Sequence, residues 1–212
     1  MYVPSHFAVD EVATRRLLAG QSTADLVTAT PRGLVATFLP ILYEPAGDGY
    51  GSVLGHVARA NDQWRLPVLG EALMIVHGAD AYVSPSWYPS KAAHGRVVPT
   101  WDYAAAHVYG RLVVHDDPVW LESLVRRLTD KHEAPRAQPW SVDDAPAPYV
   151  AGQLGAIVGV EVTVTRIETK AKWSQNRPAP DIDGVIEGLG TTGQVDAAQA
   201  VRAARPVPGP WP

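Results

Sequence analysis

The sequence predicts a mainly β protein, a small barrel with flanking helices. The first observation is a series of short β-type runs, each bounded by proline or glycine turn signals. The second is that helical periodicity does not alternate strictly with these runs, as it would in a parallel doubly wound sheet. The third is the length of 212 residues, which fits one domain or one domain with a small appendage.

Local signals set the expected boundaries of the β-type runs. The turn signal at residues 31–33 predicts a hairpin between the two runs around it. Pro40 predicts that the returning strand bends or lies at an edge there. A tight turn is expected at residues 78–80, and the alternating valines of residues 158–164 are typical of a half-buried antiparallel strand. We expect strands at residues 24–30, 33–42, 52–57, 73–77, 81–84, 108–115 and 158–165.

The strongest helix signal begins at Asp117 and Pro118, an N-cap followed by proline at the first helical position. Apolar residues from Leu121 to Leu128 then recur at three- and four-residue spacing, so this helix should extend to about His132. Weaker helical signals lie at residues 10–18, 149–154, 181–189 and 194–204. The proline-rich tail over residues 205–212 is expected to be docked on a neighbour or frayed.

The composition excludes several classes of protein. The chain has no cysteine, which excludes disulfide frameworks, thiolate zinc sites and cysteine nucleophiles. No apolar run approaches the roughly 20 residues of a membrane span, and the N-terminal residues do not read as a secretory signal. The net charge is −4, with neither a basic face nor a helix-turn-helix signature, so direct DNA binding is disfavoured. We expect a cytoplasmic protein.

Residues 82–110 combine aromatic rings with hydrogen-bond donors and with prolines that fix bends. Such a stretch suits a pocket for a flat, polar, negatively charged ligand, although a hairpin whose aromatic rings only pack together has the same composition. Four polar segments are expected at or beyond strand ends, where a barrel presents loops. They lie at residues 56–65, 84–91, 98–107 and 172–177.

Motifs for catalysis give a weaker signal in this sequence than the four polar segments do. The seven histidines show no paired metal-ligand spacing such as HExxH. No serine lies in a GxSxG nucleophile elbow. The glycines of residues 47–51 lie between expected strands and open no helix, so they indicate a turn and not a dinucleotide-binding loop.

The four polar segments read HVARAN, SPSWY followed by SK, VPTWDY with AAAHVYG, and KWSQNR. In this order they resemble the motifs of the PaiB-type proteins, known as FMN-binding negative transcriptional regulators. The resemblance extends from MYVPSHF at the N-terminus through DGVIEGL and ends near Gly193. It implies a domain over residues 1–193 with the split β-barrel fold of pyridoxamine-phosphate oxidase and the flavin reductases. Residues 194–212 then form a C-terminal helix and tail.

The resemblance further implies a homodimer with two FMN sites at the subunit interface. Arg59 and Asn61 would contact the phosphate, and the strand at residues 37–40 would lie along the isoalloxazine edge. Residues 172–177 would approach from the C-terminal side or from the partner chain. The residues that the resemblance places at FMN are Thr37, Leu39, His56, Arg59, Asn61, Ser86, Trp87, Tyr88, Lys91, Trp101, Lys172, Gln175, Asn176 and Arg177.

Two positions depart from the family pattern. Asp102 stands where asparagine is usual, which would bring a negative charge near the flavin. Trp173 stands where a smaller aliphatic residue is usual, and its indole would fill part of the ring site.

Three functions remain open from the sequence. The first is a flavin-dependent redox or flavin-sensing protein, in which the cofactor supplies the chemistry. The second is a regulator without turnover that acts through a partner. The third is haem binding by a split-barrel relative, with His56 or His107 as the axial ligand.

Overall fold

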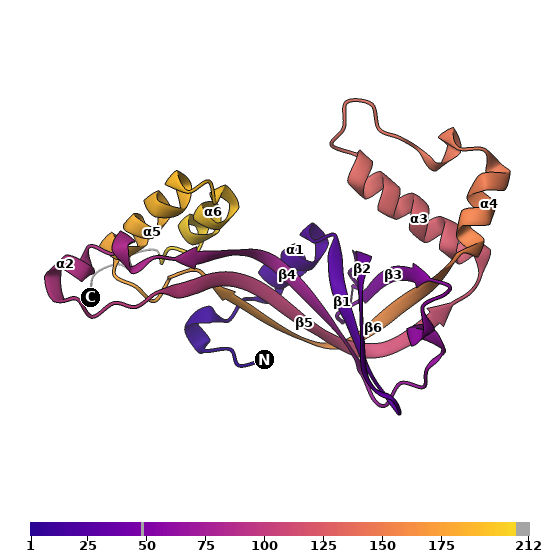
Figure 1. Cartoon of the computed structure of the whole chain (residues 1–212), viewed down its shortest axis with the longest axis horizontal. Coiled ribbons are helices and arrows are strands. Elements are labelled where there is room, and N and C mark those ends of the chain that lie inside the picture. The colour runs from indigo at the N-terminus through magenta and orange to yellow at the C-terminus, as the bar shows by residue number, and fades with distance from the viewer. Residues whose placement is uncertain (48, 207–212) are drawn as a thin grey trace. The chain divides into compact units, whose positions relative to one another are not determined.

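A computed structural model describes residues 1–47 and 49–206 of the chain (Figure 1). Six antiparallel strands follow one another in space in the order β1-β2-β3-β6-β5-β4, and β4 returns to pair with β1, which closes the barrel. The mainly β barrel predicted from the sequence is confirmed. The strands are β1 (Thr23–Thr30), β2 (Gly33–Glu44), β3 (Ser52–Ala58), β4 (Ala72–Val83), β5 (Thr100–His115) and β6 (Ile157–Lys172).

Helices flank the strands, as expected. Asp117 caps the longest helix by accepting a hydrogen bond from the Trp120 N–H at 3.0 Å, and Asp10 accepts one from the Ala13 N–H at 2.7 Å. The α-helices are α1 (Glu11–Gly20), α2 (Ser90–His94), α3 (Pro118–Glu133), α4 (Ala147–Gly155), α5 (Ala179–Thr191) and α6 (Val195–Ala203). The short 3-10 turns are η1 (Ser5–Phe7), η2 (Asp62–Arg65), η3 (Pro85–Trp87) and η4 (Val142–Asp144).

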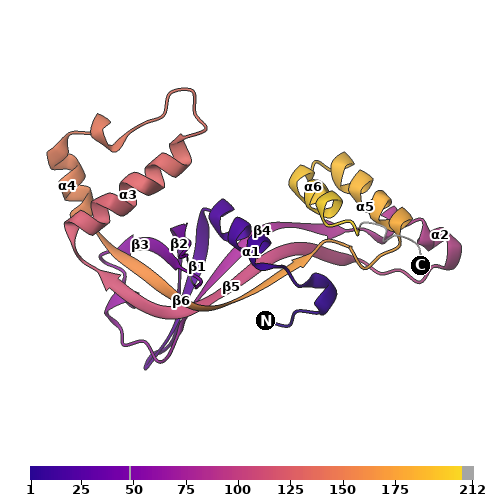
Figure 2. The same ribbon diagram turned by 180° about the vertical axis from the view of Figure 1, so that it is seen from behind.

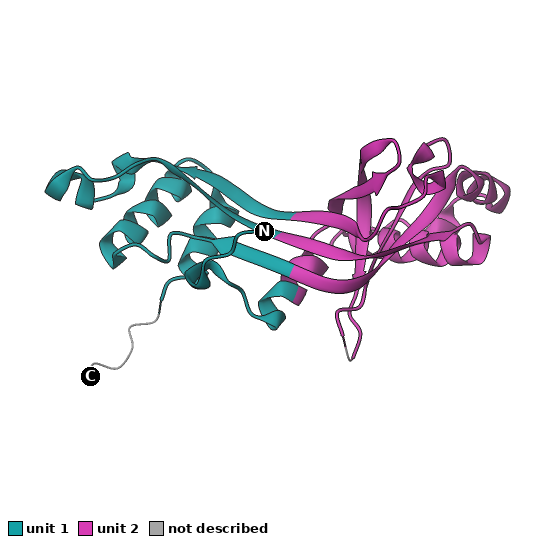
Figure 3. Ribbon diagram, turned by 90° about the horizontal axis from the view of Figure 1, so that it is seen from below, with its two compact units in different colours: residues 1–14, 77–105, 168–212 teal, residues 15–76, 106–167 magenta. Residues whose placement is uncertain are grey.

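The chain divides into two compact units, coloured separately in Figure 3. Unit 1 contains residues 1–14 and 77–105 together with the described part of 168–212, and unit 2 contains residues 15–76 and 106–167. Strands β4, β5 and β6 each continue from one unit into the other. The domain boundary expected near residue 193 stays a prediction.

Unit 2 contains most of the barrel core. Side chains that alternate along its strands point inward, and the largest are fully buried, including Leu26, Leu39, Ile41, Val53 and Met74. Pro40 lies where β2 leaves its pairing with β1 and begins its pairing with β3, so the missing N–H falls at the end of a ladder. On the outward face of β2 and β3, Leu42 and Leu54 pack against α3.

In unit 1, α5 and α6 pack against the segments of the strands that belong to the same unit. The two helices run beside each other in both views (Figures 1 and 2), and Ile182, Val185, Leu189 and Val201 are buried among strand residues such as Val83. The helices were expected at residues 181–189 and 194–204, and both expectations are confirmed.

Three expectations about the strands are wrong. The tight turn at residues 78–80 does not form, because β4 continues through it as extended chain. The segment at residues 98–107 is not a loop, since β5 already begins at Thr100. Strand β6 continues to Lys172, well past residue 165. In each case pairing with a neighbouring strand outweighs the local glycine or polar composition.

The expected tail lies mostly outside the described residues, at 207–212. Within the described part of the chain, no helix is both long enough and apolar enough to cross a membrane.

Candidate functional site

The site residues expected from the sequence are divided between the two units. Unit 2 contains Thr37, Leu39, His56, Arg59 and Asn61. Unit 1 contains Ser86, Trp87, Tyr88, Lys91, Trp101, Lys172, Gln175, Asn176 and Arg177. Each set is therefore described within its own unit.

Arg59 follows β3 and ties the loop there to the start of β6. Its Nε donates to the Gly155 carbonyl at 2.7 Å, and its Nη2 donates to the Ile157 carbonyl at 3.0 Å. Both terminal nitrogens also donate to the Asp116 carboxylate, which lowers the pKa of Asp116. A phosphate approaching Arg59 would therefore compete with Asp116.

Asn61 connects the same loop to β2. Its Nδ2 donates to the Thr37 hydroxyl at 2.9 Å, while its Oδ1 accepts from the Gln63 N–H at 2.8 Å and so caps η2. Gln63 is buried and its Nε2 donates to the carbonyls of Leu26 and Val35. Thr37, Arg59 and Asn61 thus belong to one hydrogen-bonded end of the barrel.

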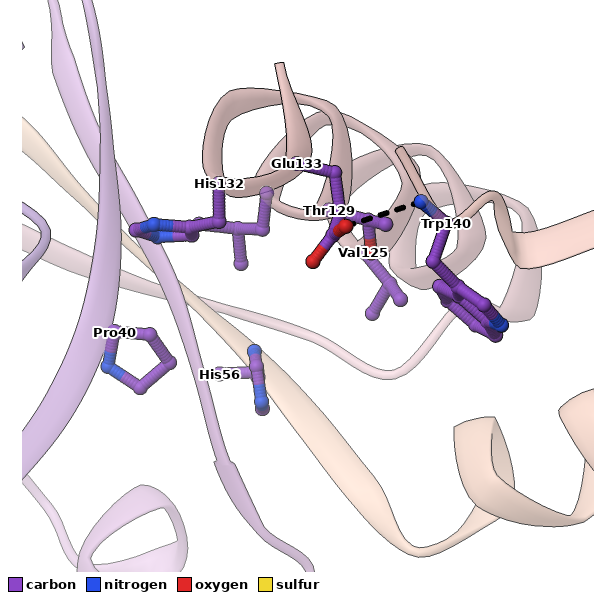
Figure 4. Close-up of a pocket in the computed structure, with 8 residues that line it drawn as sticks. Pro40, His56, Val125, Thr129, His132, Glu133 and Trp140 are labelled. Atoms are coloured by element: carbon purple, nitrogen blue, oxygen red, sulfur yellow. Dashed lines mark hydrogen bonds between the residues drawn. The ribbon is translucent and has the colours of Figure 1, made fainter. Parts of the chain in front are cut away.

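A hollow of about 320 Å³ lies beside this end, between the strands and α3 (Figure 4). Pro40 and His56 form its strand side, next in register after the Ile41–Gly55 pair of β2 and β3. Figure 4 shows the opposite wall, which α3 and the segment after it provide. That wall consists of Val125, Leu128, Thr129, His132, Glu133 and Trp140.

His56 is the unusual group in this hollow. Its Nδ1 is buried without a hydrogen-bond partner among the described residues. Burial lowers the pKa of the His56 imidazole, so the neutral ring prevails near pH 7. An unpaired buried nitrogen is costly, and a ligand atom that bonded it would remove that cost.

Leu39, also expected at the flavin, is 1% exposed and packs in the barrel core. Because its side chain is enclosed in that core, only the backbone of Leu39 could contact a ligand.

In unit 1, a buried carboxylate holds the KWSQNR segment. Asp102 is completely buried, accepts from the Ser174 hydroxyl at 2.7 Å and pairs with Lys172 Nζ at 3.1 Å. Burial raises the pKa of Asp102, while Ser174 and Lys172 oppose the rise by favouring the ionised form. Lys172 Nζ also donates to the Thr100 hydroxyl at 2.8 Å and to the Trp101 carbonyl at 2.7 Å.

The turn after Lys172 is held by its own side chains. Ser174 adopts a left-handed φ of 57°, and the Gln175 amide bridges the Ala171 carbonyl and the Trp173 N–H. Trp173 is buried in the core of unit 1 with α5 and α6, which explains the larger residue at this position.

Most of the remaining residues of the unit 1 set, Asn176 excepted, also have contacts described within unit 1. Trp87 packs on α5 so closely that a Cβ at Gly188 would lie 2.2 Å from its ring. Lys91 Nζ donates to the Ser86 hydroxyl, and Arg177 lies 4.8 Å over the Tyr88 ring. Trp101 is half exposed and donates to Asp80, while Asn176 is exposed.

Sequence reasoning missed the α3 side of the hollow. Val125, Thr129, His132 and Glu133 belong to an amphipathic helix whose partly buried face looks like ordinary packing. Trp140 lies in a proline-rich connection, and its backbone N–H donates to the Glu133 carboxylate at 3.0 Å. Only the fold places these residues opposite Pro40 and His56, so no local signal could have identified them.

The chain matches the family model described as "Putative FMN-binding domain" over residues 1–166. It is 32% identical over 191 residues to the protease synthase and sporulation protein PAI 2 of Bacillus subtilis, covering 89% of each chain.

Two solved structures share the fold. A conserved hypothetical protein of Mycobacterium tuberculosis has a TM-score of 0.55 at 12% identity, covering 84% of this chain and 94% of that one. The FAD and heme binding protein of Mycobacterium smegmatis has a TM-score of 0.51 at 14% identity, covering 79% of this chain and 74% of that one.

Proposed function

We propose a flavin site on unit 2, from the premise that this chain belongs to the family of FMN-binding domains, with a split β-barrel fold and FMN as its cofactor. The observation that carries the proposal is the hollow between α3 and the strands β2 and β3, which the neutral imidazole of His56 helps to line. The protein is then a flavin-dependent redox or flavin-sensing protein.

The residues of unit 2 that line the hollow suit the isoalloxazine ring of FMN. A flat ring system needs apolar walls with a few polar partners, and the hollow offers Pro40, Val125 and Leu128 together with His56. Its volume of about 320 Å³ is in the range of ordinary ligand pockets.

On the side of the phosphate, Arg59 and Asn61 supply charge and an amide donor at the adjoining barrel end. Arg59 would exchange its hydrogen bonds with Asp116 for bonds to the phosphate.

Bound FMN supplies hydride and single-electron transfer. The residues of the chain bind and orient it: Arg59 and Asn61 hold the phosphate side, and Pro40 and α3 exclude water from the ring. The His56 imidazole, which burial keeps neutral near pH 7, lines the same hollow. The residues of unit 1 that the sequence also suggested for FMN stay a prediction.

A homodimer is part of the proposal, because an apolar sheet face of unit 2 lies open beside the hollow. On β2, the face that carries Leu42 under α3 and Pro40 in the hollow continues to Phe38 and Leu34, which are 69% and 79% exposed. The neighbouring strands add Val27 across from Ala36 and Leu73 across from Val27. Apolar patches of this kind typically mark protein interfaces.

A second copy packed on Phe38 would also cover the side of the hollow next to Pro40, so each site would be completed by the partner. We expect sedimentation as a dimer at micromolar concentration. Phe38→Asp should weaken dimerisation by at least about 100-fold, because a charge would be buried in the interface. The control is Arg32→Asp in the exposed turn of the same hairpin, which should remain dimeric. A wild-type monomer would refute this arrangement.

Flavin binding itself is tested by the visible spectrum of the purified protein, recorded before and after FMN is added and free flavin removed. We expect absorbance near that of protein-bound flavin after the addition. Arg59→Ala should weaken FMN binding, whereas Asp116→Asn should strengthen it, because the amide releases Arg59 for the phosphate. Equal affinity in all three proteins would exclude Arg59 from the phosphate site.

Two other functions remain candidates. The name of the Bacillus subtilis relative concerns protease synthesis and sporulation, which supports a regulator that acts through a partner. Haem binding is supported by His56, whose imidazole lines the hollow. A Soret band on haem titration that His56→Ala abolishes would favour it. The cytoplasmic location expected from the sequence remains part of the proposal.

A further inference from the structure

The α3–α4 excursion, residues 116–156, leaves the barrel after β5 and ends where β6 begins (Figure 1). It lies within unit 2 and carries α3, η4 and α4. Its residues form the wall of the hollow that faces Pro40 and His56, and most of the lining of an adjoining hollow of about 270 Å³. Contacts that hold this segment in place therefore also set the shape of the candidate flavin site.

A single side chain, that of Arg59, joins both ends of the α3–α4 excursion to the barrel. At the start, Nη1 and Nη2 donate to the two carboxylate oxygens of Asp116, which lies between β5 and the N-cap of α3. At the end, Nε donates to the Gly155 carbonyl at 2.7 Å, and Nη2 donates to the Ile157 carbonyl at 3.0 Å. The two ends of the excursion therefore meet on one guanidinium group.

These contacts occupy both edges of the Arg59 guanidinium at which two parallel hydrogen bonds can form. The group has five N–H donors, and the contacts use four of them: one on Nε, one on Nη1 and two on Nη2. The N–H that they leave, on Nη1, can give a phosphate one hydrogen bond but not the bidentate pair typical of arginine. A phosphate held by two N–H groups must therefore displace the contacts at one end of the excursion.

The two helices of the excursion differ in how firmly they are held. Helix α3 buries a stripe of leucines against the outer face of β2 and β3. Among the described residues of α4, Leu154 is the only buried one, and no side chain caps the start of that helix. Segments with few buried contacts open most readily. The ends of the excursion and α4 should therefore depend on Arg59 more than the middle of α3 does.

We propose that Arg59 is a latch for the α3–α4 excursion, and that a phosphate bound to Arg59 opens the latch at one end. The identity of the phosphate, that of FMN, rests on the proposed function. Asp116 carries a negative charge that a phosphate repels, so the start of the excursion is the end that opens. Occupancy of the phosphate site is then transmitted to the segment that walls the hollow. This coupling gives a flavin-sensing protein a part that changes with its ligand.

The latch itself is tested without flavin, by amide hydrogen exchange on the full chain. Arg59→Ala removes the side-chain contacts but keeps the backbone bond from the N–H of this residue to the Ala156 carbonyl. We expect exchange about five-fold faster at residues 116–121 and 153–157, the change typical of losing a net hydrogen bond. The matched control is Arg65→Ala, which should leave both ends unchanged because Arg65 lies in the same loop but pairs with Asp62. Unchanged exchange in Arg59→Ala would overturn the latch.

The effect of the phosphate is tested by comparing FMN with riboflavin, which has the same ring system without the phosphate. We expect saturating FMN to raise exchange about three-fold at residues 116–121, and riboflavin to leave it unchanged. In Asp116→Asn the contact with Arg59 is already weakened, so FMN should raise exchange there less. Equal effects of bound FMN and riboflavin would overturn the coupling. A rise confined to residues 153–157 would overturn the assignment of Asp116 as the displaced partner.

Failure of this inference can be distinguished from failure of the proposed function. Flavin absorbance reports FMN uptake separately from hydrogen exchange. A protein that takes up no FMN refutes the flavin function and the coupling together, while faster exchange in Arg59→Ala would still support the latch. A protein that takes up FMN without any change in exchange at either end of the excursion refutes only the coupling.

Discussion

Unit 1 and unit 2 use similar residues in different ways. In unit 1, Asp102, Lys172 and Ser174 satisfy one another, and Trp87 packs on α5. In unit 2, His56 keeps a nitrogen without a partner among the described residues, at the wall of a hollow. This contrast shows that a motif rich in aromatic and polar residues can stabilise the fold of a segment as readily as it can bind a ligand. We therefore expect substitutions in the unit 1 set to alter mainly stability, and those in the unit 2 set to alter mainly binding.

The largest expected effect is on stability, for Lys172→Met in unit 1. The substitution leaves Asp102 fully buried without its cation, and breaking a buried pair in this way costs about 3 kcal/mol. Denaturant unfolding measures the loss, and FMN uptake per folded molecule should not change. A stable variant that no longer takes up FMN would place Lys172 at the flavin, as the family resemblance implied.

A comparison within α5 tests the role of Trp87. Gly188→Ala should lower the free energy of unfolding by about 2 kcal/mol, since the new Cβ would overlap the indole ring and force a shift. Gly190→Ala on the same helix meets nothing within 4 Å and should raise it by up to about 1 kcal/mol. If both variants unfold alike in urea, the close packing of Trp87 on α5 is not what stabilises unit 1.

Two substitutions of Asn61 distinguish its contribution to the stability of unit 2 from its contribution to FMN binding. Asn61→Ala removes the cap of η2 and the bond to Thr37, and should cost about 1 kcal/mol of stability. Asn61→Asp retains the capping oxygen but replaces the amide donor with a negative charge. It should remain nearly as stable as the wild type and yet bind FMN several-fold more weakly, as measured by flavin titration. Unchanged FMN affinity in Asn61→Asp would remove this residue from the phosphate site.

The smallest effect concerns pH and His56. Because burial lowers the pKa of His56 in the folded state, the unfolded chain binds the proton more readily. The stability linked to His56 is therefore complete above its unfolded pKa of about 6.5 and falls as the pH drops from there toward the folded value. Urea midpoints at pH 7.5 and 5.0 should differ less in His56→Phe than in the wild type. An identical difference in the two proteins would contradict a neutral, buried imidazole.

The sequence predicted the strands and helices where local signals and tertiary contacts agree. The hairpin at Pro31 to Gly33 and the helix capped by Asp117 are examples, because turn chemistry and capping act within a few residues. It failed at residues 78–80 and 100–107, where a glycine and polar side chains suggested loops. Those segments are strands because β4 and β5 are neighbours in the sheet, and strand pairing depends on residues distant in sequence.

For the candidate site, the amino-acid sequence was enough to assign the family and the cofactor class and to identify His56 in β3 with Arg59 and Asn61 after that strand. The packing of distant segments sets which of these residues border a hollow, because α3 and Trp140 must lie over Pro40 and His56. It also decided that Asp102 is buried beside Lys172. Motifs consist of residues close together in the sequence, but burial and unpaired hydrogen-bonding atoms arise only when distant segments pack together.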